Sequence, residues 1–165
     1  MARFAMIATR GARLGPYQLT ECIGRGGMAA VYRGKRRGPG GFEKQVVVKT
    51  ILPALVRKPR FRRMFSDEAR LTAQLSHNNV VQVLDFGFAG DTPYLAMEFL
   101  RGRDLGKLIK TTAGFLPVAE VVDVMLSVCA AIRACHDAGI IHRDLKPSNV
   151  FLCDGDNEPE VKILD

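Results

Sequence analysis

Apolar positions along the first hundred residues fall in short runs, several of which alternate with polar positions. Runs of this kind, rich in β-branched and aromatic residues and bounded by Gly, Pro or polar clusters, are typical of β-strands. The pattern predicts five strands: YQLTECIG at 17–24, AAVYRGK at 29–35, EKQVVVKTIL at 43–52, NVVQVLDFGF at 79–88 and PYLAMEFL at 93–100.

Three further segments have helical spacing. Asp104 is placed to cap a short helix at 105–110. Pro117 opens a long amphipathic helix that Gly139 ends. Its expected apolar stripe is Val118, Val121, Val122, Met125, Cys129 and Ile132. Another helix is predicted at 60–75, where the apolar residues three to four apart are Phe61, Met64, Phe65 and Leu75.

The end of the chain returns to strands. NVFL and VKIL, separated by an acidic loop, predict a β-hairpin. Strands with one helix, followed by a mainly helical part, predict an α+β fold with two lobes joined near residue 100.

Composition changes this picture little. A hydrophobic content of 47% in 165 residues is enough for one folded domain. We interpret residues 1–16 as a lead-in that precedes this domain. No apolar run approaches the roughly 20 residues of a membrane helix, so no membrane segment is expected. Four cysteines without a C-x-x-C pair favour a reducing, cytoplasmic location.

Charge is uneven along the chain, which carries a net +7. Residues 1–70 hold 16 Lys and Arg against 4 Asp and Glu, whereas residues 71–165 hold 8 against 13. Basic runs such as RKPRFRR at 57–63 can bind nucleic acid. Since no aromatic interleaving or nucleic-acid motif accompanies them, we interpret them as a solvated face and expect no nucleic-acid partner.

The first candidate for chemistry is the glycine-rich IGRGGMAAV at 23–31. Gly24, Gly26 and Gly27 leave backbone N–H groups open to phosphate oxygens. Many such stretches are ordinary turns. A dinucleotide-binding turn would lead into a helix, but this one leads into a strand. The pattern therefore indicates a hairpin tip folded over its ligand.

Lys49 and Glu68 are the second candidate. Lys49 ends a strand that reads as buried, and the helical count places Glu68 on the apolar stripe of its helix. An unpaired carboxylate facing a core would cost several kcal/mol. Taken singly, a lysine at a strand edge is ordinary. Together, the two residues predict an ion pair.

The third candidate for chemistry is the polar cluster in HRDLKPSN at 142–149, together with the final Asp165. Asn149 begins the predicted hairpin and Asp165 follows its second strand, so the two residues could lie side by side. Both offer the oxygen ligands that Mg²⁺ prefers. Asp144 is then free to accept a proton, and Lys146 to neutralise a phosphoryl group. Caps, turns or surface salt bridges are the simpler explanation for any one of them, but not for all in this order.

These motifs together resemble the eukaryotic-type Ser/Thr protein kinase catalytic domain, close to its bacterial members, over residues 17–165. IGRGGMAAVYRG, VVVK, SDEARLTAQLSHNNVV, YLAMEFLRGRDL and HRDLKPSN carry the resemblance. It implies a two-lobed kinase-like fold: an N-lobe and hinge at 17–100, with a five-stranded antiparallel sheet and one helix, and the first part of a helical C-lobe at 101–165.

The resemblance also implies roles for individual residues. Asp144 would be the catalytic base, Lys146 would contact the γ-phosphate, and Asn149 and Asp165 would hold Mg²⁺. Lys49, paired with Glu68, would contact the ATP phosphates, Met97 would be the gatekeeper, and the backbone of Glu98 and Leu100 would bind adenine. The implied ATP-binding set is Ile23, Gly24, Arg25, Gly26, Gly27, Val31, Val47, Lys49, Met97, Glu98 and Leu100.

The implied function is ATP-dependent phosphoryl transfer to Ser or Thr hydroxyls of a protein substrate. The lysine two residues after Asp144 stands where Ser/Thr kinases of this family carry one, so in this feature the chain resembles Ser/Thr kinases rather than Tyr kinases. Ala29 replaces the third glycine of the loop, and Val47 replaces the usual alanine. The resemblance stops at Asp165, the first letter of D-F-G, so we expect a fragment. The alternatives are a nucleotide-binding or partner-binding module without catalysis and, more weakly, a small-molecule kinase.

Overall fold

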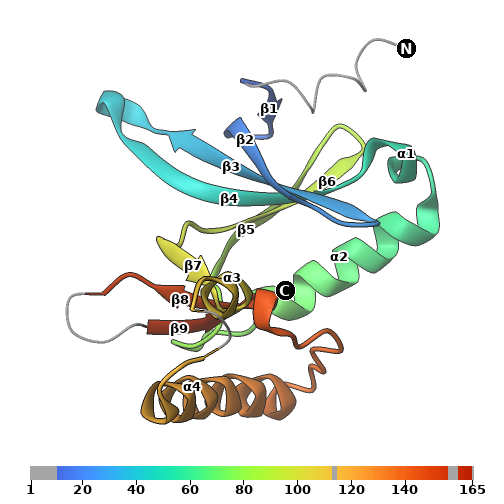
Figure 1. Cartoon of the computed structure of the whole chain (residues 1–165). Helices are drawn as coiled ribbons and strands as arrows, with labels where there is room; N and C mark the ends of the chain where they lie inside the picture. Colours follow the sequence, from blue (N-terminus) through green and yellow to red (C-terminus); the bar gives the residue numbers. More distant parts are fainter. Residues whose placement is uncertain (1–10, 113–114, 156–159, 165) are drawn as a thin grey trace. The chain divides into compact units, whose positions relative to one another are not determined.

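A computed structural model describes residues 11–112, 115–155 and 160–164 (Figure 1). The chain divides into two compact units. The first unit contains the residues up to Gln74 together with Val83–Phe99, and the second contains Leu75–Gln82 together with the residues from Leu100.

The first unit is built on an antiparallel sheet in the order β1-β2-β3-β4-β6-β5. Its strands are β1 (Arg13–Leu14), β2 (Tyr17–Arg25), β3 (Ala29–Arg37), β4 (Glu43–Ile51), β5 (Val83–Ala89) and β6 (Thr92–Glu98). The five-strand prediction missed β1, which lies in the segment interpreted as a lead-in and pairs with β2. Two residues are too few to show a periodic pattern.

The predicted strand at 79–88 begins later, at Val83. Residues before it belong to the second unit, where Val80 bridges Ile163 and the Val81 amide donates to the Ile163 carbonyl at 3.0 Å. An apolar run that is continuous in sequence is therefore divided between two units.

Two helices complete the first unit: α1 (Pro53–Val56) and α2 (Pro59–Ala73), each with proline at its start. In α2, Phe65 and Ala69 are buried, while Met64 is exposed. The expected stripe is therefore only partly correct, and Leu75 lies beyond the helix. A short 3-10 turn (Pro39–Gly41) joins β3 to β4.

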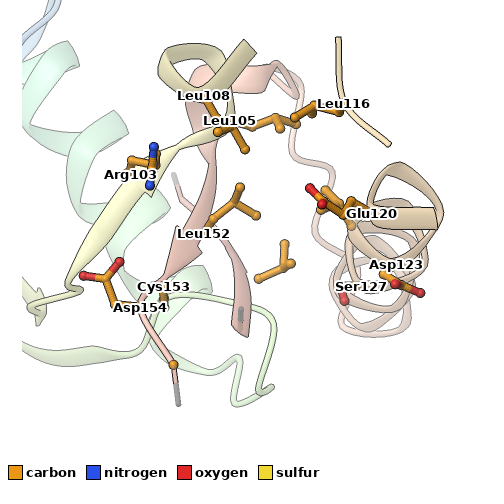
Figure 2. A pocket seen from close by; sticks show the side chains of 13 residues that line it. Arg103, Leu105, Leu108, Leu116, Glu120, Asp123, Ser127, Leu152, Cys153 and Asp154 are labelled. Atoms are coloured by element: carbon orange, nitrogen blue, oxygen red, sulfur yellow. The ribbon is translucent and has the colours of Figure 1, made fainter. Parts of the chain in front are cut away.

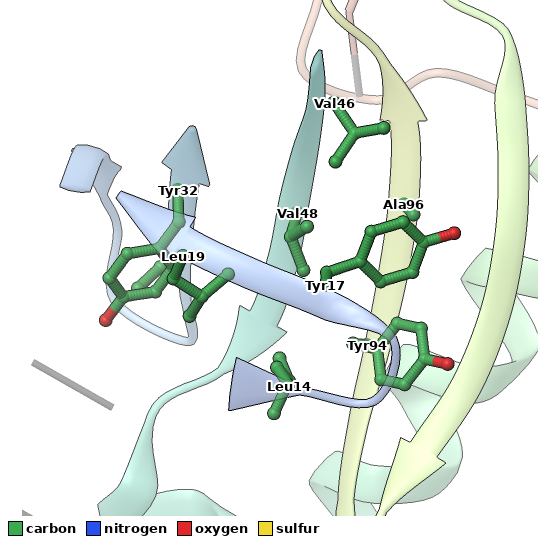
Figure 3. Packing of buried hydrophobic residues seen from close by; sticks show 9 residues of the cluster. Leu14, Tyr17, Leu19, Tyr32, Val46, Val48, Tyr94 and Ala96 are labelled. Atoms are coloured by element: carbon green, nitrogen blue, oxygen red, sulfur yellow. The ribbon is translucent and has the colours of Figure 1, made fainter. Parts of the chain in front are cut away.

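One face of the sheet carries the core of the first unit (Figure 3). The Tyr17 and Tyr94 rings meet edge to face, with centroids 5.7 Å apart. Both hydroxyls donate to Asp85 Oδ2, at 3.0 Å from Tyr17 and 3.5 Å from Tyr94. A Cβ on Gly87 would lie 2.5 Å from the Tyr94 hydroxyl, so glycine is needed there to seat the ring.

The second unit has a three-stranded antiparallel sheet in the order β7-β8-β9. Its elements are β7 (Gly102–Asp104), α3 (Leu105–Thr111), α4 (Val118–Asp137), a 3-10 turn (Pro147–Asn149), β8 (Val150–Cys153) and β9 (Glu160–Ile163). The predicted hairpin is present as β8 and β9, whereas β7 was not predicted. As expected, Asp104 caps α3, its Oδ1 accepting from the Lys107 amide at 2.8 Å.

Helix α4 is apolar on two sides. The buried side consists of Val124, Val128, Ala131 and Cys135, which join the core with residues of β8 and β9. Most of the stripe selected from the sequence lies exposed instead, and Ile132 alone packs partly against the core. No helix in the described part of the chain is both long and apolar enough to span a membrane.

Burial and the hydrogen bond to Asp85 raise the pKa of Tyr17 to about 12. Tyr17→Phe removes the shorter bond to Asp85, so we expect a loss of about 1.5 kcal/mol of unfolding free energy. Because the pKa of Tyr17 is higher in the folded state, the protonated hydroxyl stabilises the fold below pH 10. This stabilisation is lost between pH 10 and 12, as Tyr17 ionises in the folded state. Urea unfolding at pH 7 and pH 11 should show the difference between wild type and variant shrinking.

Tyr32→Phe is the control, because Tyr32 is also buried but donates no hydrogen bond to a described residue. An equal loss in both variants would show that the Asp85 network contributes nothing specific.

The exposed side of α4 predicts self-association of the isolated chain. Val121, Val122, Met125 and Leu126 are each at least 41% exposed and adjoin along the helix. Val122→Gln with Met125→Gln should raise the monomer fraction in sedimentation velocity. A wild-type chain that already sediments as a single monomer would contradict this expectation.

Candidate functional site

The glycine-rich turn connects β2 to β3 in the first unit, closed by a 2.9 Å bond from the Gly26 amide to the Ala29 carbonyl. None of Gly24, Gly26 and Gly27 has the positive φ that requires glycine. A Cβ on Gly27 would meet nothing within 4 Å, and one on Gly26 only the Ala29 carbonyl at 3.8 Å. Since folding does not demand glycine at the tip, the absence of side chains there leaves room for an external anion to approach the backbone.

Strand register places several candidate residues on the sheet face opposite the Tyr17 core. Val46 and Val48 of β4 are buried in that core. Alternation along a strand therefore turns Val47 and Lys49 to the other face. Cross-strand pairs add Val31, opposite Lys49, and Met97, opposite Val47.

The remaining residues of the expected ATP-binding set do not share this sheet face in the strand register. Ile23 is 46% exposed and Arg25 is exposed beside the turn, and Glu98 is half-buried at the end of β6. Leu100 belongs to the second unit.

Lys49 and Glu68 form an ion pair, with Lys49 Nζ 3.0 Å from Glu68 Oε1. The Lys49 side chain is 12% exposed, but the Glu68 side chain is 50% exposed. The expectation that Glu68 faces a core is therefore wrong: it lies between the buried Phe65 and Ala69 of α2 but projects toward solvent. The pair ties β4 to α2 at small energetic gain, because half-exposed pairs contribute about 0–1 kcal/mol.

The 142–149 loop of the second unit brings three polar side chains together. Lys146 Nζ lies 2.6 Å from Asp144 Oδ2. The Asn149 amide Nδ2 donates to the Asp144 carbonyl at 2.9 Å and to its Oδ2 at 3.4 Å. The Lys146 hydrogen bond holds the pKa of Asp144 below its usual value.

Backbone contacts fix this loop. The His142 ring Nε2 lies 3.1 Å from the Leu164 carbonyl, and the Leu164 amide donates to the Asn149 carbonyl at 2.8 Å. Arg143 has a φ of 63°, the only positive value for a non-glycine residue in the described part of the chain. Neither the positive φ of Arg143 nor the contact between His142 and Leu164 was predicted from the sequence. The His142 contact depends on Leu164, which follows β9 and is distant in the chain.

A magnesium ion would need oxygen ligands at this loop. Asn149 fits such a role: its Nδ2 is engaged with Asp144, and its amide oxygen accepts no hydrogen bond from the described residues. Asp165, the other proposed ligand, lies outside the described residues. Within those residues, no group of three His, Cys, Asp or Glu side chains is arranged to hold a metal.

Comparison with known proteins gives consistent matches. The family described as protein kinase domain matches residues 17–165. Serine/threonine-protein kinase Pkn1 of Myxococcus xanthus is 40% identical over 94% of this chain and 22% of Pkn1. Tyrosine-protein kinase MasK of Myxococcus xanthus strain DK1622 is 37% identical over 92% of this chain and 25% of MasK.

Among solved structures, the Mycobacterium tuberculosis PknI kinase domain superposes with a TM-score of 0.78 at 28% identity, covering 95% of this chain and 62% of the solved kinase-domain chain. The chain thus spans about a quarter of these curated relatives, and under two thirds of this solved domain.

The short contact to Lys146 predicts the titration of Asp144. Lys146→Met should raise the carboxyl pKa of Asp144 toward the value of a free aspartate, so that it protonates at higher pH. Carboxyl ¹³C chemical shifts followed from pH 2 to 7 would report the change. Lys110→Met, on α3, is the control, and an equal shift in both variants would assign the effect to overall charge.

Proposed function

Because this chain belongs to the protein kinase family, we propose that the protein carrying it transfers the γ-phosphoryl group of ATP to serine and threonine hydroxyls of proteins. The observation that carries the proposal is the convergence of Lys146 and Asn149 on Asp144 in one loop. A lysine at this position favours serine and threonine over tyrosine, and Pkn1 carries the same specificity in its name. MasK, named a tyrosine kinase, makes the acceptor residue worth measuring directly.

We assign nucleotide binding chiefly to the first unit. The backbone of Gly24, Gly26 and Gly27 would approach the phosphates, flanked by Ile23, Arg25 and Val31. Lys49, held by Glu68, would neutralise phosphate charge. Val47 and Met97 share its sheet face and would contact adenine, with the backbone of Glu98 and Leu100 as hydrogen-bonding partners. Residues 17–100 would then be the N-lobe and hinge, and 101–165 the first part of the C-lobe.

Transfer itself would depend on the 142–149 loop. With its pKa lowered, Asp144 is ionised at neutral pH and accepts a hydrogen bond from the substrate hydroxyl. The proton passes to Asp144 as the hydroxyl oxygen bonds to the γ-phosphorus and the bond to ADP breaks. Lys146 stabilises the charge on the transferring group. Mg²⁺, held by Asn149 and Asp165, would neutralise the phosphate oxygens.

We further propose a cytoplasmic location, where ATP is available. Cysteine thiols at positions 22, 129, 135 and 153 are compatible with a reducing compartment.

Nucleotide binding should raise the melting temperature of the chain. At a hundredfold excess over the dissociation constant, Mg-ATP would stabilise the fold by about 2.7 kcal/mol. Lys49→Met should abolish most of the shift, whereas Lys44→Met, at an exposed position of the same strand, should retain it. Differential scanning fluorimetry measures both, and no shift in the wild type would count against nucleotide binding.

Phosphoryl transfer should be lost in Asp144→Asn, which removes the proton acceptor but keeps the side-chain shape. The assay follows ³²P from [γ-³²P]ATP into a basic test protein, using the protein that carries this domain, and phosphoamino-acid analysis identifies the acceptor. Label on serine and threonine is expected. Label on tyrosine would refute the proposed specificity, and ATP binding without any transfer would favour the non-catalytic binding module.

A further inference from the structure

The end of the β3–β4 hairpin extends past the other strands of the first unit (Figure 1). Strand β3 pairs with β2 only as far as Arg36, opposite Tyr17, and β4 pairs with β6 only from Val46 onward. In the described part of the chain, residues 37–45 therefore pair with no third strand. Residues 39–45 are all exposed, so this end of the hairpin is an open surface.

The turn at this end carries an uncovered aromatic side chain, because Phe42 is 63% exposed. Two backbone hydrogen bonds close the turn. The Gly38 amide donates to the Phe42 carbonyl at 2.8 Å, and the Phe42 amide donates to the Pro39 carbonyl at 3.3 Å. A single exposed apolar side chain is ordinary on a protein surface. Its meaning at this turn depends on the charges beside it.

Two basic side chains lie directly opposite each other next to the turn. The strand register pairs Arg36 with Lys44, and alternation turns both toward the sheet face that carries Tyr32 and Val46. Like charges directly opposite each other in adjacent strands destabilise a sheet. Both residues are exposed, and neither forms an ion pair with a described residue. This repulsion is relieved when an external anion binds to the two cations.

The other face of the hairpin end is basic as well. Lys35 and Arg37 both donate to Glu43, at 3.0 and 3.2 Å, and the Lys35 hydrogen bond holds the pKa of Glu43 below its usual value. Glu43 is the one acidic residue in segment 35–44, whose cations are Lys35, Arg36, Arg37 and Lys44. Four cations and one carboxylate give this segment a net charge of +3.

The cavity of the second unit, which Figure 2 shows, does not compete for an anionic ligand. Glu120, Asp123 and Asp154 line it, and Arg103 is the one basic residue among its lining residues. An anionic ligand would be repelled there and attracted to the hairpin end.

We propose that the end of the β3–β4 hairpin binds the surface of an anionic phospholipid bilayer. Phe42 would enter the interface, and Arg36 and Lys44 would contact lipid phosphates. Basic residues are attracted by the negative surface potential of such a bilayer, and an apolar side chain gains by leaving water at the acyl boundary. Residues 38–41 are glycine and proline, so the turn can enter the interface without burying a charge.

A nucleic acid would use the same cations, but an uncharged turn with one phenylalanine gives its phosphates nothing to contact. The bilayer is therefore the partner that uses both the cations and Phe42. None of these hairpin residues is assigned to nucleotide binding or to phosphoryl transfer.

Binding would be measured by co-sedimentation of the 165-residue chain with vesicles. One set contains equal parts of phosphatidylglycerol and phosphatidylcholine, and the other contains phosphatidylcholine alone. We expect saturable binding to the anionic vesicles that weakens at higher salt. Binding to the neutral vesicles should be weaker by about tenfold or more.

The variant Arg36→Gln with Lys44→Gln should weaken binding to the anionic vesicles about tenfold or more. Arg60→Gln with Arg63→Gln removes the same charge from exposed positions of α2 and should bind as the wild type does. Because the hairpin variant loses a pair of like charges, it should melt no lower than the wild type. This melting temperature also verifies that the variant is folded.

Insertion of the turn has a separate readout, because the chain contains no tryptophan. The emission of a Phe42→Trp variant should shift to the blue on anionic vesicles and stay unchanged on neutral ones. Phe42→Ser should weaken binding, whereas Phe115→Ser, at an exposed phenylalanine of the second unit, should not.

Three results would overturn the proposal. The first is equal binding to neutral and anionic vesicles, which would indicate general hydrophobic adhesion. The second is an equal loss of affinity in the hairpin variant and in the α2 variant, which would indicate an effect of total charge. The third is release of the chain from vesicles by a single-stranded oligonucleotide at equal phosphate concentration, which would reassign the surface to nucleic acid.

Discussion

The ion pair between Lys49 and Glu68 is the contact on which the proposed chemistry of the first unit depends. It joins the middle of a sheet to helix α2, in which the neighbouring Phe65 and Ala69 are buried. Because the Glu68 side chain is half exposed to solvent, the ion pair adds little to folding stability. Its consequence is positional: a flexible lysine side chain is held at one point of the sheet face that also carries Val31, Val47 and Met97.

The two faces of the same strand have different tasks. Val46 and Val48 of β4 pack with Tyr17 and Tyr94, and the Tyr-Asp85 hydrogen bonds fasten β2 to β5 and β6 on that side. Rigid packing on one face fixes where the residues of the other face lie. The second unit uses another device, in which the Leu164 backbone contacts both His142 and Asn149 and holds the loop that presents Asp144.

Much of this could be predicted from the sequence, because it depends on local patterns. The strands β2, β3, β4 and β6, the cap at Asp104 and the β8–β9 hairpin all follow from periodicity and turn residues. What could not be predicted depends on neighbours distant in the chain. Strand β1 exists only through pairing with β2, and the run before Val83 divides because Val80 pairs with Ile163. Helix α4 is apolar on two sides, so periodicity alone could not identify which side is buried.

The central claim is that Lys49 binds a phosphate of the nucleotide and that Asn149, in the 142–149 loop, holds a metal ion. A crystal structure of the chain with Mn²⁺ and a non-hydrolysable ATP analogue tests this most directly. The account predicts Lys49 Nζ within hydrogen-bonding distance of a phosphate oxygen, and an anomalous manganese peak coordinated by the Asn149 amide oxygen. A nucleotide bound with its phosphates away from Lys49, or manganese bound without Asn149, would contradict it.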